Sequence, residues 1–329
     1  MGKFEVVKYT DKYQERWDQF VLENSMNGTF LQTRNFLNYH PEGRFQDASI
    51  LILQGSTIAA VIPACDIIEE EKHCFFSHPG STFGGIIVEN DKYNISTMEE
   101  LFPCLEDYLK IEGYEQAIMK GTSDIFSNNC NDLFDYYFFK NGWKRYNELS
   151  LYINCETLAD DIISGFTAGR RRDYRYSLKS EMIFKELEDD SEIEEFYKVL
   201  CNNLKKYGVL PVHTLDELLE FKHDRLKEYV GFYGAYLGDK LLAGSMVFYF
   251  GQKVFHTQYL AMDNEYSNIF PMNFLDYHLI RTAKEKGFDK FSFGISTEER
   301  GRILNTSLAQ FKEGFGCDYC VNRSYDKFI

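Results

Sequence analysis

The sequence predicts a mixed α/β (α+β) protein made of two similar domains, and three observations carry this prediction. In Leu241–Gly294, two apolar, aromatic-rich runs meet at Gly251-Gln252, which is typical of a β-hairpin. A helix follows, with Pro271 at its start, apolar residues at i, i+3 and i+4 spacing, and Gly287 as its cap. The same order of strand, loop, helix and strand recurs in Phe83–Gly121, although helix–glycine–aromatic–strand is also a common connection. We therefore expect tandem domains at residues 1–155 and 156–329, each a mixed, largely antiparallel sheet flanked by helices.

The remaining elements follow from hydrophobic periodicity and turn residues. In the first half, we expect helices at Asp11–Ser25, Arg34–Tyr39, Met98–Glu112 and Cys130–Asn141. Strands are expected there at Ser49–Leu53, Thr57–Asp66, Cys74–Ser77, Phe83–Val88, Tyr114–Lys120 and Trp143–Asn154. In the second half, we expect helices at Ala168–Ser180, Ser191–Lys206 and Thr214–Tyr229, and strands at Met182–Leu187 and Val230–Leu237.

Composition narrows the class of protein. The chain has 329 residues, of which 44% are hydrophobic, so it can bury two sizeable cores. Its formal net charge of −15 excludes nonspecific nucleic-acid binding by the whole surface, because phosphate affinity comes from Lys and Arg. The charged N-terminal stretch has no secretory h-region, and no apolar run approaches the ~20 residues that span a bilayer. We expect a cytoplasmic protein with no integral membrane association.

The cysteines and histidines do not predict a metal site. The eight cysteines are scattered through the chain, which is typical of reduced thiols. Cys317 and Cys320 form a lone Cys-x-x-Cys with no second half, and two strand residues on one face explain the spacing as well. No His, Cys and Asp cluster has the spacing of metal ligands.

Four segments, in the expected order, resemble the Fem-type (FemAB-like) transferases of the GNAT-like acyltransferase superfamily. They are Thr29–Thr33, the Arg-rich Gly169–Arg175, the strand Phe291–Gly294, and Asn305 followed by Phe311–Gly316. The resemblance implies two tandem GNAT-like domains that transfer an acyl or aminoacyl group to an amine. It also implies no tightly bound cofactor, with aminoacyl-tRNA or acyl-CoA as the donor substrate.

The loop before the Pro271 helix bears on the choice of donor. A GNAT domain needs glycine-rich backbone amides at a helix start to hold the coenzyme A pyrophosphate. Asp263–Phe270 contains no glycine, Pro271 lacks an amide hydrogen, and Asp263 and Glu265 repel phosphate. Glu89–Thr97, in the first half, also lacks glycine. Both loops favour a donor other than acyl-CoA.

Three residues are candidates for catalysis. Lys312 matches the Lys of the family's terminal Phe-Lys-x-Gly-Phe pattern, where the resemblance implies that a cation steadies a phosphate or the developing oxyanion; a solvated helix-end lysine is the alternative. His78 lies in a loop of small polar residues. It is either a general base with a pKa near neutrality or a structural histidine in a turn. Tyr259 lies at the end of a predicted strand. We expect it either to line the acceptor site or to be a half-buried strand tyrosine.

Substrate binding is expected from the basic segment. Arg171 and Arg175 share one helical face with Lys179, and Arg172 lies between them in sequence; these arginines can clamp a nucleotide-linked acceptor or a tRNA backbone. A solvated basic face paired with acidic residues is the alternative. Asn305 is a weaker substrate-binding candidate.

The sequence thus predicts an N-acyl- or aminoacyltransferase that forms an amide on a cell-envelope or polysaccharide intermediate. The alternatives are an acyl-CoA-dependent N-acetyltransferase and a non-catalytic GNAT-like binding module. The oligomeric state is not predicted.

Overall fold

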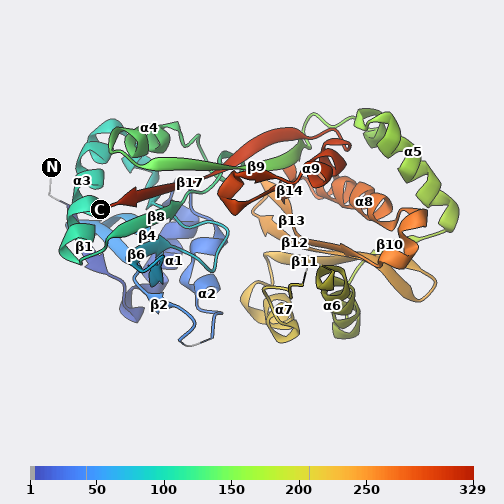
Figure 1. Cartoon of the computed structure of the whole chain (residues 1–329), viewed down its shortest axis with the longest axis horizontal. Coiled ribbons are helices and arrows are strands. Elements are labelled where there is room, and N and C mark those ends of the chain that lie inside the picture. The colour runs from blue at the N-terminus through green and yellow to red at the C-terminus, as the bar shows by residue number, and fades with distance from the viewer. Residues whose placement is uncertain (1–3, 42, 207) are drawn as a thin grey trace. The chain divides into compact units, whose positions relative to one another are not determined.

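The computed structural model describes residues 4–41, 43–206 and 208–329, which form two compact units (Figure 1). Unit 1 runs to Glu148 and also contains Glu299–Arg302 and Val321–Ile329, whereas unit 2 consists of Leu149–Glu298 and Ile303–Cys320. Each unit combines a largely antiparallel mixed sheet with helices, so the predicted fold class is confirmed. The domain limits 1–155 and 156–329 stay a prediction, and the sequence analysis did not foresee that the chain re-enters unit 1 twice.

The sheet of unit 2 has six strands in the order β10, β11, β12, β13, β14 and β9. These strands are β10 (Ile183–Glu186), β11 (Val230–Leu237), β12 (Lys240–Phe250), β13 (Val254–Met262), β14 (Lys290–Ile295) and β9 (Lys144–Asn154). Neighbours are antiparallel except β13 and β14, which run parallel. A parallel pair needs a crossover connection, and α8 (Pro271–Glu285) supplies it.

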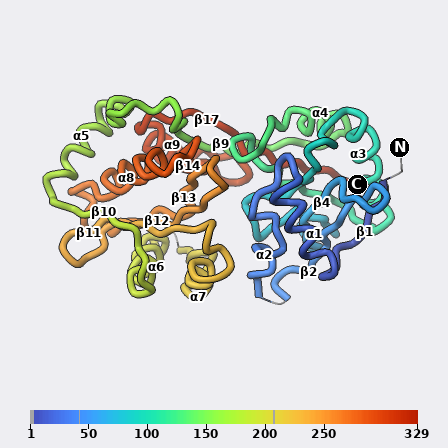
Figure 2. The backbone as a smooth tube through the Cα atoms, turned by 180° about the vertical axis from the view of Figure 1, so that it is seen from behind, coloured from blue at the N-terminus to red at the C-terminus, as the bar shows by residue number. Residues whose placement is uncertain are grey.

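Helices cover both faces of this sheet, as the views from the front and from behind show (Figures 1 and 2). On one face lie α6 (Asp190–Lys205) and α7 (Leu215–Glu220). On the other lies α8, with α5 (Ala168–Ser177) packed against it. The α8 side chains Phe274, Leu275 and Leu279 share a buried core with the strand residues Phe255 and Phe291. The predicted helix Thr214–Tyr229 is shorter, because α7 gives way to a π-helical turn at Phe221–Arg225.

Two elements near the C-terminus complete the fold. The helix α9 (Thr306–Glu313) belongs to unit 2, and the strand β17 (Asp318–Phe328) starts in unit 2 and continues in unit 1. The short strands β15 (Thr297–Glu298) and β16 (Ile303–Leu304) pair before α9. The sequence analysis named residues here but did not assign these elements.

Unit 1 contains two sheets. One has the order β17, β8, β6, β5 and β2, formed with β8 (Gln116–Lys120), β6 (Lys72–Ser77), β5 (Cys65–Glu69) and β2 (Gln46–Asp47). The other has the order β1, β3, β4 and β7, formed by β1 (Phe4–Lys8), β3 (Ile50–Gln54), β4 (Thr57–Ile62) and β7 (Ile87–Val88). Its helices are α1 (Gln14–Gln19), α2 (Arg34–Leu37), α3 (Ile95–Ile111) and α4 (Asp132–Lys140).

The internal repeat is present, with one correction. The parallel strands β6 and β8 of unit 1 correspond to β13 and β14 of unit 2. The strand parallel to β8 is therefore β6, whereas the predicted strand Phe83–Val88 is reduced to β7, which pairs with β4. The predicted strand Thr57–Asp66 is also wrong as one element: it divides into β4 and β5 around Pro63, which has no amide hydrogen for a sheet.

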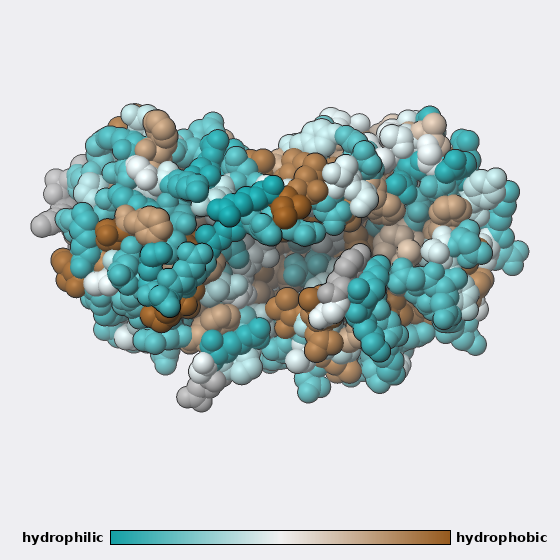
Figure 3. Space-filling view, viewed as in Figure 1, coloured by the Kyte–Doolittle hydropathy of each residue, from teal (hydrophilic) through white to brown (hydrophobic). Residues whose placement is uncertain are grey.

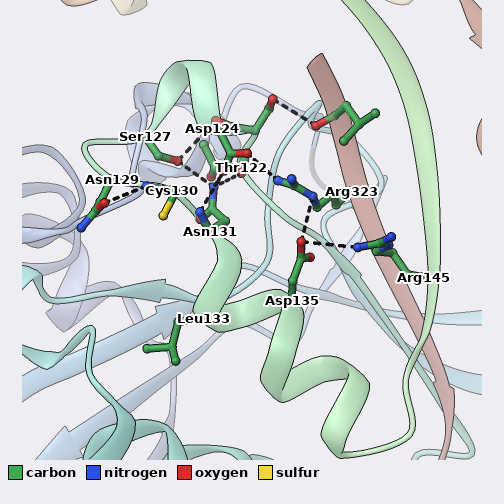
Figure 4. A network of polar contacts seen from close by, with 12 residues as sticks. Thr122, Asp124, Ser127, Asn129, Cys130, Asn131, Leu133, Asp135, Arg145 and Arg323 are labelled. Carbon is green, nitrogen blue, oxygen red and sulfur yellow. Dashed lines mark hydrogen bonds and ion pairs between the residues drawn. The ribbon is translucent and has the colours of Figure 1, made fainter. Parts of the chain in front are cut away.

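An ionic network anchors β17 within unit 1 (Figure 4). The guanidinium of Arg323 lies 2.7 Å from Asp124 and 3.0 Å from Asp135. The Asn131 amide donates to Asp124, and Arg145 makes a longer ion pair with Asp135, at 3.5 Å. The last strand is thus tied to the segments on either side of the start of α4.

Hydrophilic residues cover most of the surface that Figure 3 shows, with hydrophobic residues scattered among them. Among the helices of the described residues, none combines the length and apolar character that crossing a membrane requires.

Candidate acyl-transfer site

The two parallel strands of unit 2 diverge at one end. β13 pairs with β14 only from Val254 to His256. Beyond His256, β13 continues to Met262 without pairing with β14. At this point Gly294 has a φ of +71°, and a Cβ there would lie 3.0 Å from His256 Cε1. Only glycine fits this backbone without strain. Ligands gather where parallel strands end and part, so this is the expected place for a site.

A pocket of about 390 Å³ lies beside the diverging strands, within unit 2. We call it the Lys312 pocket. Its lining combines the ends of β13, α8, α5 and α9, with Leu260, Met262, Asn273, Arg170, Phe311 and Lys312 among the side chains.

Lys312 is buried in this pocket, with an exposure of 4%. Its Nζ donates to the carbonyl oxygen of Ile295 at 2.6 Å and to that of Gly294 at 3.2 Å. Burial lowers the pKa of its ammonium to about 8, against the opposing influence of Cys317 and Asp276. The alternative of a solvated helix-end lysine is thereby excluded, because the ammonium lies inside the pocket and bonds the end of β14. An ammonium held in this way can donate a further hydrogen bond to an oxyanion.

The sequence analysis did not name Asn273 and Asp276 as candidates, and it named Arg170 only as part of the basic segment Gly169–Arg175. Asn273 Nδ2, Arg170 Nε and both carboxylate oxygens of Asp276 are buried without a hydrogen-bond partner among the residues that the structure describes. Asn273 and Arg170 line the pocket, so their donors are available to a carbonyl or anionic group there. One signal was present in the sequence: Asn273 and Asp276 stand among the apolar residues of the helix face that packs on the sheet.

The predicted substrate-binding arginines lie on another face of α5. Arg171, Arg172 and Arg175 line an open groove of about 450 Å³ with Ala168, Tyr176 and Lys179. Arg172 pairs with Asp173 at 2.8 Å, and Arg171 donates to the Ser164 carbonyl at 3.4 Å. This cavity, the α5 groove, presents guanidinium groups and the exposed ring of Tyr176 to solvent.

Tyr259 and Asn305 belong to unit 2 but make other contacts. The Tyr259 hydroxyl lies 2.7 Å from His213 Nδ1, and burial raises its pKa to about 12. Tyr259 points to the opposite face of β13 from Leu260 and Met262, which line the Lys312 pocket. Asn305 is the N-cap of α9, where its side chain accepts from the Leu308 amide at 3.2 Å.

His78 belongs to unit 1. It is 5% exposed, its Nδ1 accepts from the Gly80 amide at 3.1 Å, and its ring stacks on His40. Burial, with the nearby His40, lowers its pKa to about 3, whereas the sequence analysis expected a value near neutrality. Within unit 2, Lys312 lines the pocket at the strand ends and Tyr259 does not. The catalytic and binding roles of all these residues stay predictions.

The start of α8 has the features that the sequence analysis described as unfavourable for binding phosphate. Phe270 adopts a φ of +57°, Pro271 is the first helical residue, and the preceding 3-10 turn spans Asn264–Ile269. Asp263 accepts from the Glu265 amide there, so one loop donor is already used by the protein. Within the described residues, no group of His, Cys, Asp and Glu could hold a metal ion.

Comparisons with known proteins agree with this architecture. Residues 168–306 match the family model described as an acetyltransferase (GNAT) domain. A crystal structure of FemX has a TM-score of 0.69 and 13% identity, covering 99% of this chain and 97% of that one. The structure of L-PGS from Bacillus licheniformis has a TM-score of 0.58 and 13% identity, covering 99% and 93%.

A third structural neighbour is described as a protein with tandem GNAT domains. This is the tandem GNAT protein from the clavulanic acid biosynthesis pathway, with a TM-score of 0.58 and 8% identity, covering 99% of this chain and 98% of that one. No curated protein sequence matches the chain. At such identities the likeness shows the fold, and the predicted resemblance is confirmed at that level. The chain therefore has the fold of these tandem GNAT-like structures, and residues 168–306 are similar to a GNAT acetyltransferase domain.

Proposed function

We propose that the protein is an aminoacyl- or N-acyltransferase that forms an amide on an amine, with the reaction in the Lys312 pocket. The observation that carries this proposal is the buried Lys312 ammonium, fixed by the carbonyl oxygens of Gly294 and Ile295 beside the unpaired Asn273 amide. When an amine attacks an acyl carbonyl, negative charge develops on the carbonyl oxygen. Donors already in place stabilise that charge without reorganising.

The proposed acyl donor is an aminoacyl-tRNA. Two features support it over acyl-CoA: the loop before α8 lacks glycine, and Pro271 removes an amide from the helix start that would hold a pyrophosphate. The α5 groove offers Arg171, Arg172 and Arg175 to phosphates, which provides a local basic surface on a chain of net charge −15. The resemblance of the sequence to the Fem-type transferases implies a donor of this kind, and FemX shares the fold.

The proposed acceptor is the amine of a cell-envelope or polysaccharide intermediate, small or nucleotide-linked, and we place the reaction in the cytoplasm. In this mechanism the amine attacks the acyl carbon and Lys312 donates to the oxyanion; the ester C–O bond to the ribose then breaks, and the proton lost by the amine ends on the ribose oxygen, which leaves as a hydroxyl. The α5 arginines hold phosphates of the donor or of a nucleotide-linked acceptor. We retain Tyr259, His78 and Asn305 as candidates for contacts with the acceptor amine.

An acyl-CoA donor is the second candidate, because the family model that matches residues 168–306 is an acetyltransferase domain. One panel of donor substrates distinguishes the aminoacyl-tRNA donor from the acyl-CoA donor. The protein is incubated with acetyl-CoA and longer acyl-CoA esters, or with aminoacyl-tRNAs, and amide products on UDP-sugars and envelope precursors are followed by mass spectrometry.

We expect amide products with aminoacyl-tRNA that disappear in Lys312→Met, and no rise in melting temperature with millimolar coenzyme A. Products with acyl-CoA alone would assign the second candidate. If neither donor gave a product and Lys312→Met bound every tested ligand like the wild type, the protein would be a non-catalytic binding module.

A further inference from the structure

Unit 1 contains a pocket of about 690 Å³ that the proposed reaction does not use. We call it the unit 1 pocket. Its lining holds four carboxylates, four cationic side chains and the aromatic rings of Tyr146 and Phe328. A volume of this size with a few convergent polar groups is typical of small-ligand sites.

The tip of the β15–β16 hairpin, Glu299–Arg302, belongs to unit 1 and contributes to this lining. Gly301 has a φ of +85°, and a Cβ there would lie 1.9 Å from the carbonyl oxygen of Asn147 on β9, so glycine is needed for the tip to pack. The two residues before Gly301 also have positive φ values, 49° and 56°, which is uncommon outside glycine. The tip therefore has a special backbone shape that presents Arg300 and Arg302 to the pocket.

One part of the lining is a chain of four polar side chains from different elements. Gln116 Nε2 donates to Asp326 Oδ1 at 2.8 Å, and Asp326 Oδ2 lies 3.6 Å from the guanidinium of Arg300. The same guanidinium lies 2.6 Å from Glu69 Oε1. Each end of the chain leaves a buried acceptor, Gln116 Oε1 and Glu69 Oε2, without a hydrogen-bond partner among the described residues.

These acceptors require a donor with a positive charge. Gln116 is 5% exposed, and its contact with Asp326 sets which end of its amide is the oxygen. Two carboxylates and one guanidinium give the chain a formal charge of −1. An ammonium group has three donors and no acceptor, so it satisfies both the unpaired oxygens and the charge.

The other part of the lining is cationic and surrounds the ring of Tyr146. Lys144 Nζ lies 4.9 Å from the ring centre, and the guanidinium carbons of Arg302 and Arg300 lie 5.6 Å and 6.0 Å from it. Arg300 is paired with Glu69 and so connects the two parts. Lys144 and Arg302 are exposed and make no ion pair with a carboxylate in the part of the chain that the structure describes. Two such cations side by side attract an anionic group.

The two remaining carboxylates of the lining do not neutralise this cationic part. Glu70 lies 3.9 Å from Lys72, and its side chain is 82% exposed. Glu299 is also exposed. Charges in water at such positions are largely screened.

We propose that the unit 1 pocket binds a small molecule that carries both an ammonium group and a phosphate or carboxylate group. Lys144 and Arg302 hold the anionic group, and Gln116 and Glu69 accept from the ammonium. The ring of Tyr146 offers an apolar surface to the carbon skeleton between them. The site does not include Lys312, so this proposal does not depend on the proposed function.

Isothermal titration calorimetry at pH 7 with three related probes tests both parts of the site. Glucosamine 6-phosphate carries both groups, glucose 6-phosphate carries only the anion, and glucosamine carries only the ammonium. We expect glucosamine 6-phosphate to bind with a millimolar or lower Kd, and each of the other two to bind about tenfold more weakly or worse.

Variants locate the binding. Arg302→Gln, at an exposed position, should weaken the binding of glucosamine 6-phosphate about tenfold or more, and Gln116→Met should do the same. Lys110→Gln, an exposed lysine of α3 outside the lining, should bind like the wild type. If Gln116→Met does not fold, the comparison of glucosamine 6-phosphate with glucose 6-phosphate in the wild type tests the same part of the site.

Three results would overturn the proposal. They are no binding of glucosamine 6-phosphate at millimolar concentration, unchanged binding in Arg302→Gln, and equal affinity for glucose 6-phosphate, which would leave an anion site only. None of these titrations uses an acyl donor. A protein without transfer activity would therefore contradict the proposed function and leave the unit 1 pocket standing.

Discussion

Lys312 Nζ lies 2.6 Å from the carbonyl oxygen of Ile295, so the last residue of the second parallel strand holds the ammonium of the C-terminal helix. The neighbouring carbonyl of Gly294 accepts as well, and its left-handed φ is what turns the backbone toward the helix. The glycine-containing end of a strand and a lysine 17 residues further along the chain thus define one point in the pocket.

Replacing Lys312 with methionine should abolish most transfer while preserving the fold. Methionine keeps the length of the side chain, and leaving the Gly294 and Ile295 carbonyls without their donor costs about 1–3 kcal/mol, which is less than the usual stability of a folded domain. Loss of one oxyanion donor typically lowers kcat by about 10²–10³-fold. The measurement is single-turnover transfer together with the melting temperature, and Lys198→Met, an exposed lysine on α6, serves as the control. Unchanged kcat in Lys312→Met would remove the lysine from the mechanism.

Asp276 should make the protein less stable as the pH rises from about 4 to about 8. Burial raises the pKa of this carboxyl group to about 8 from 3.8, so in that interval the folded state binds more protons than the unfolded state. The free energy of unfolding then falls with rising pH, by at most about 1.4 kcal/mol per pH unit for one proton.

Urea unfolding of the wild type and of Asp276→Asn at pH 5 and pH 8 measures this effect. We expect Asp276→Asn to gain stability relative to the wild type at the higher pH. A difference between the two proteins that is the same at both pH values would show that Asp276 titrates normally.

Neutralising the α5 groove should weaken binding of phosphate-rich ligands. Arg175 makes no hydrogen bond or ion pair with the residues in the described ranges, and Arg171 makes one long bond, so both guanidinium groups remain available. Each phosphate contact that is lost should lower the salt slope of tRNA affinity by about 1. Fluorescence anisotropy with tRNA at several salt concentrations compares Arg171→Gln/Arg175→Gln with Arg281→Gln, an exposed arginine on α8. Identical slopes in both variants would place the tRNA elsewhere.

The Arg323 network should contribute to the stability of unit 1. Arg323→Met leaves the carboxylates of Asp124 and Asp135 without their shared cation, at a cost of about 2 kcal/mol. Arg145→Met should cost less than about 1 kcal/mol, because its ion pair is long and half exposed. Urea unfolding curves of the two variants give the comparison, and a larger loss in Arg145→Met would contradict the ranking.

The sequence by itself determined the tandem α/β fold, the helix from Pro271 and the missing phosphate cradle, because these depend on local periodicity, proline, glycine and charge. It also singled out Lys312 and the Arg171–Arg175 segment. Only the tertiary structure decided that β6, and not Phe83–Val88, runs parallel to β8, since pairing joins residues far apart in the chain. It alone placed Arg170 and Asn273 in the lining of the Lys312 pocket and left Tyr259 out of that lining. Burial and unpaired donors are properties of packing, which no stretch of sequence carries alone.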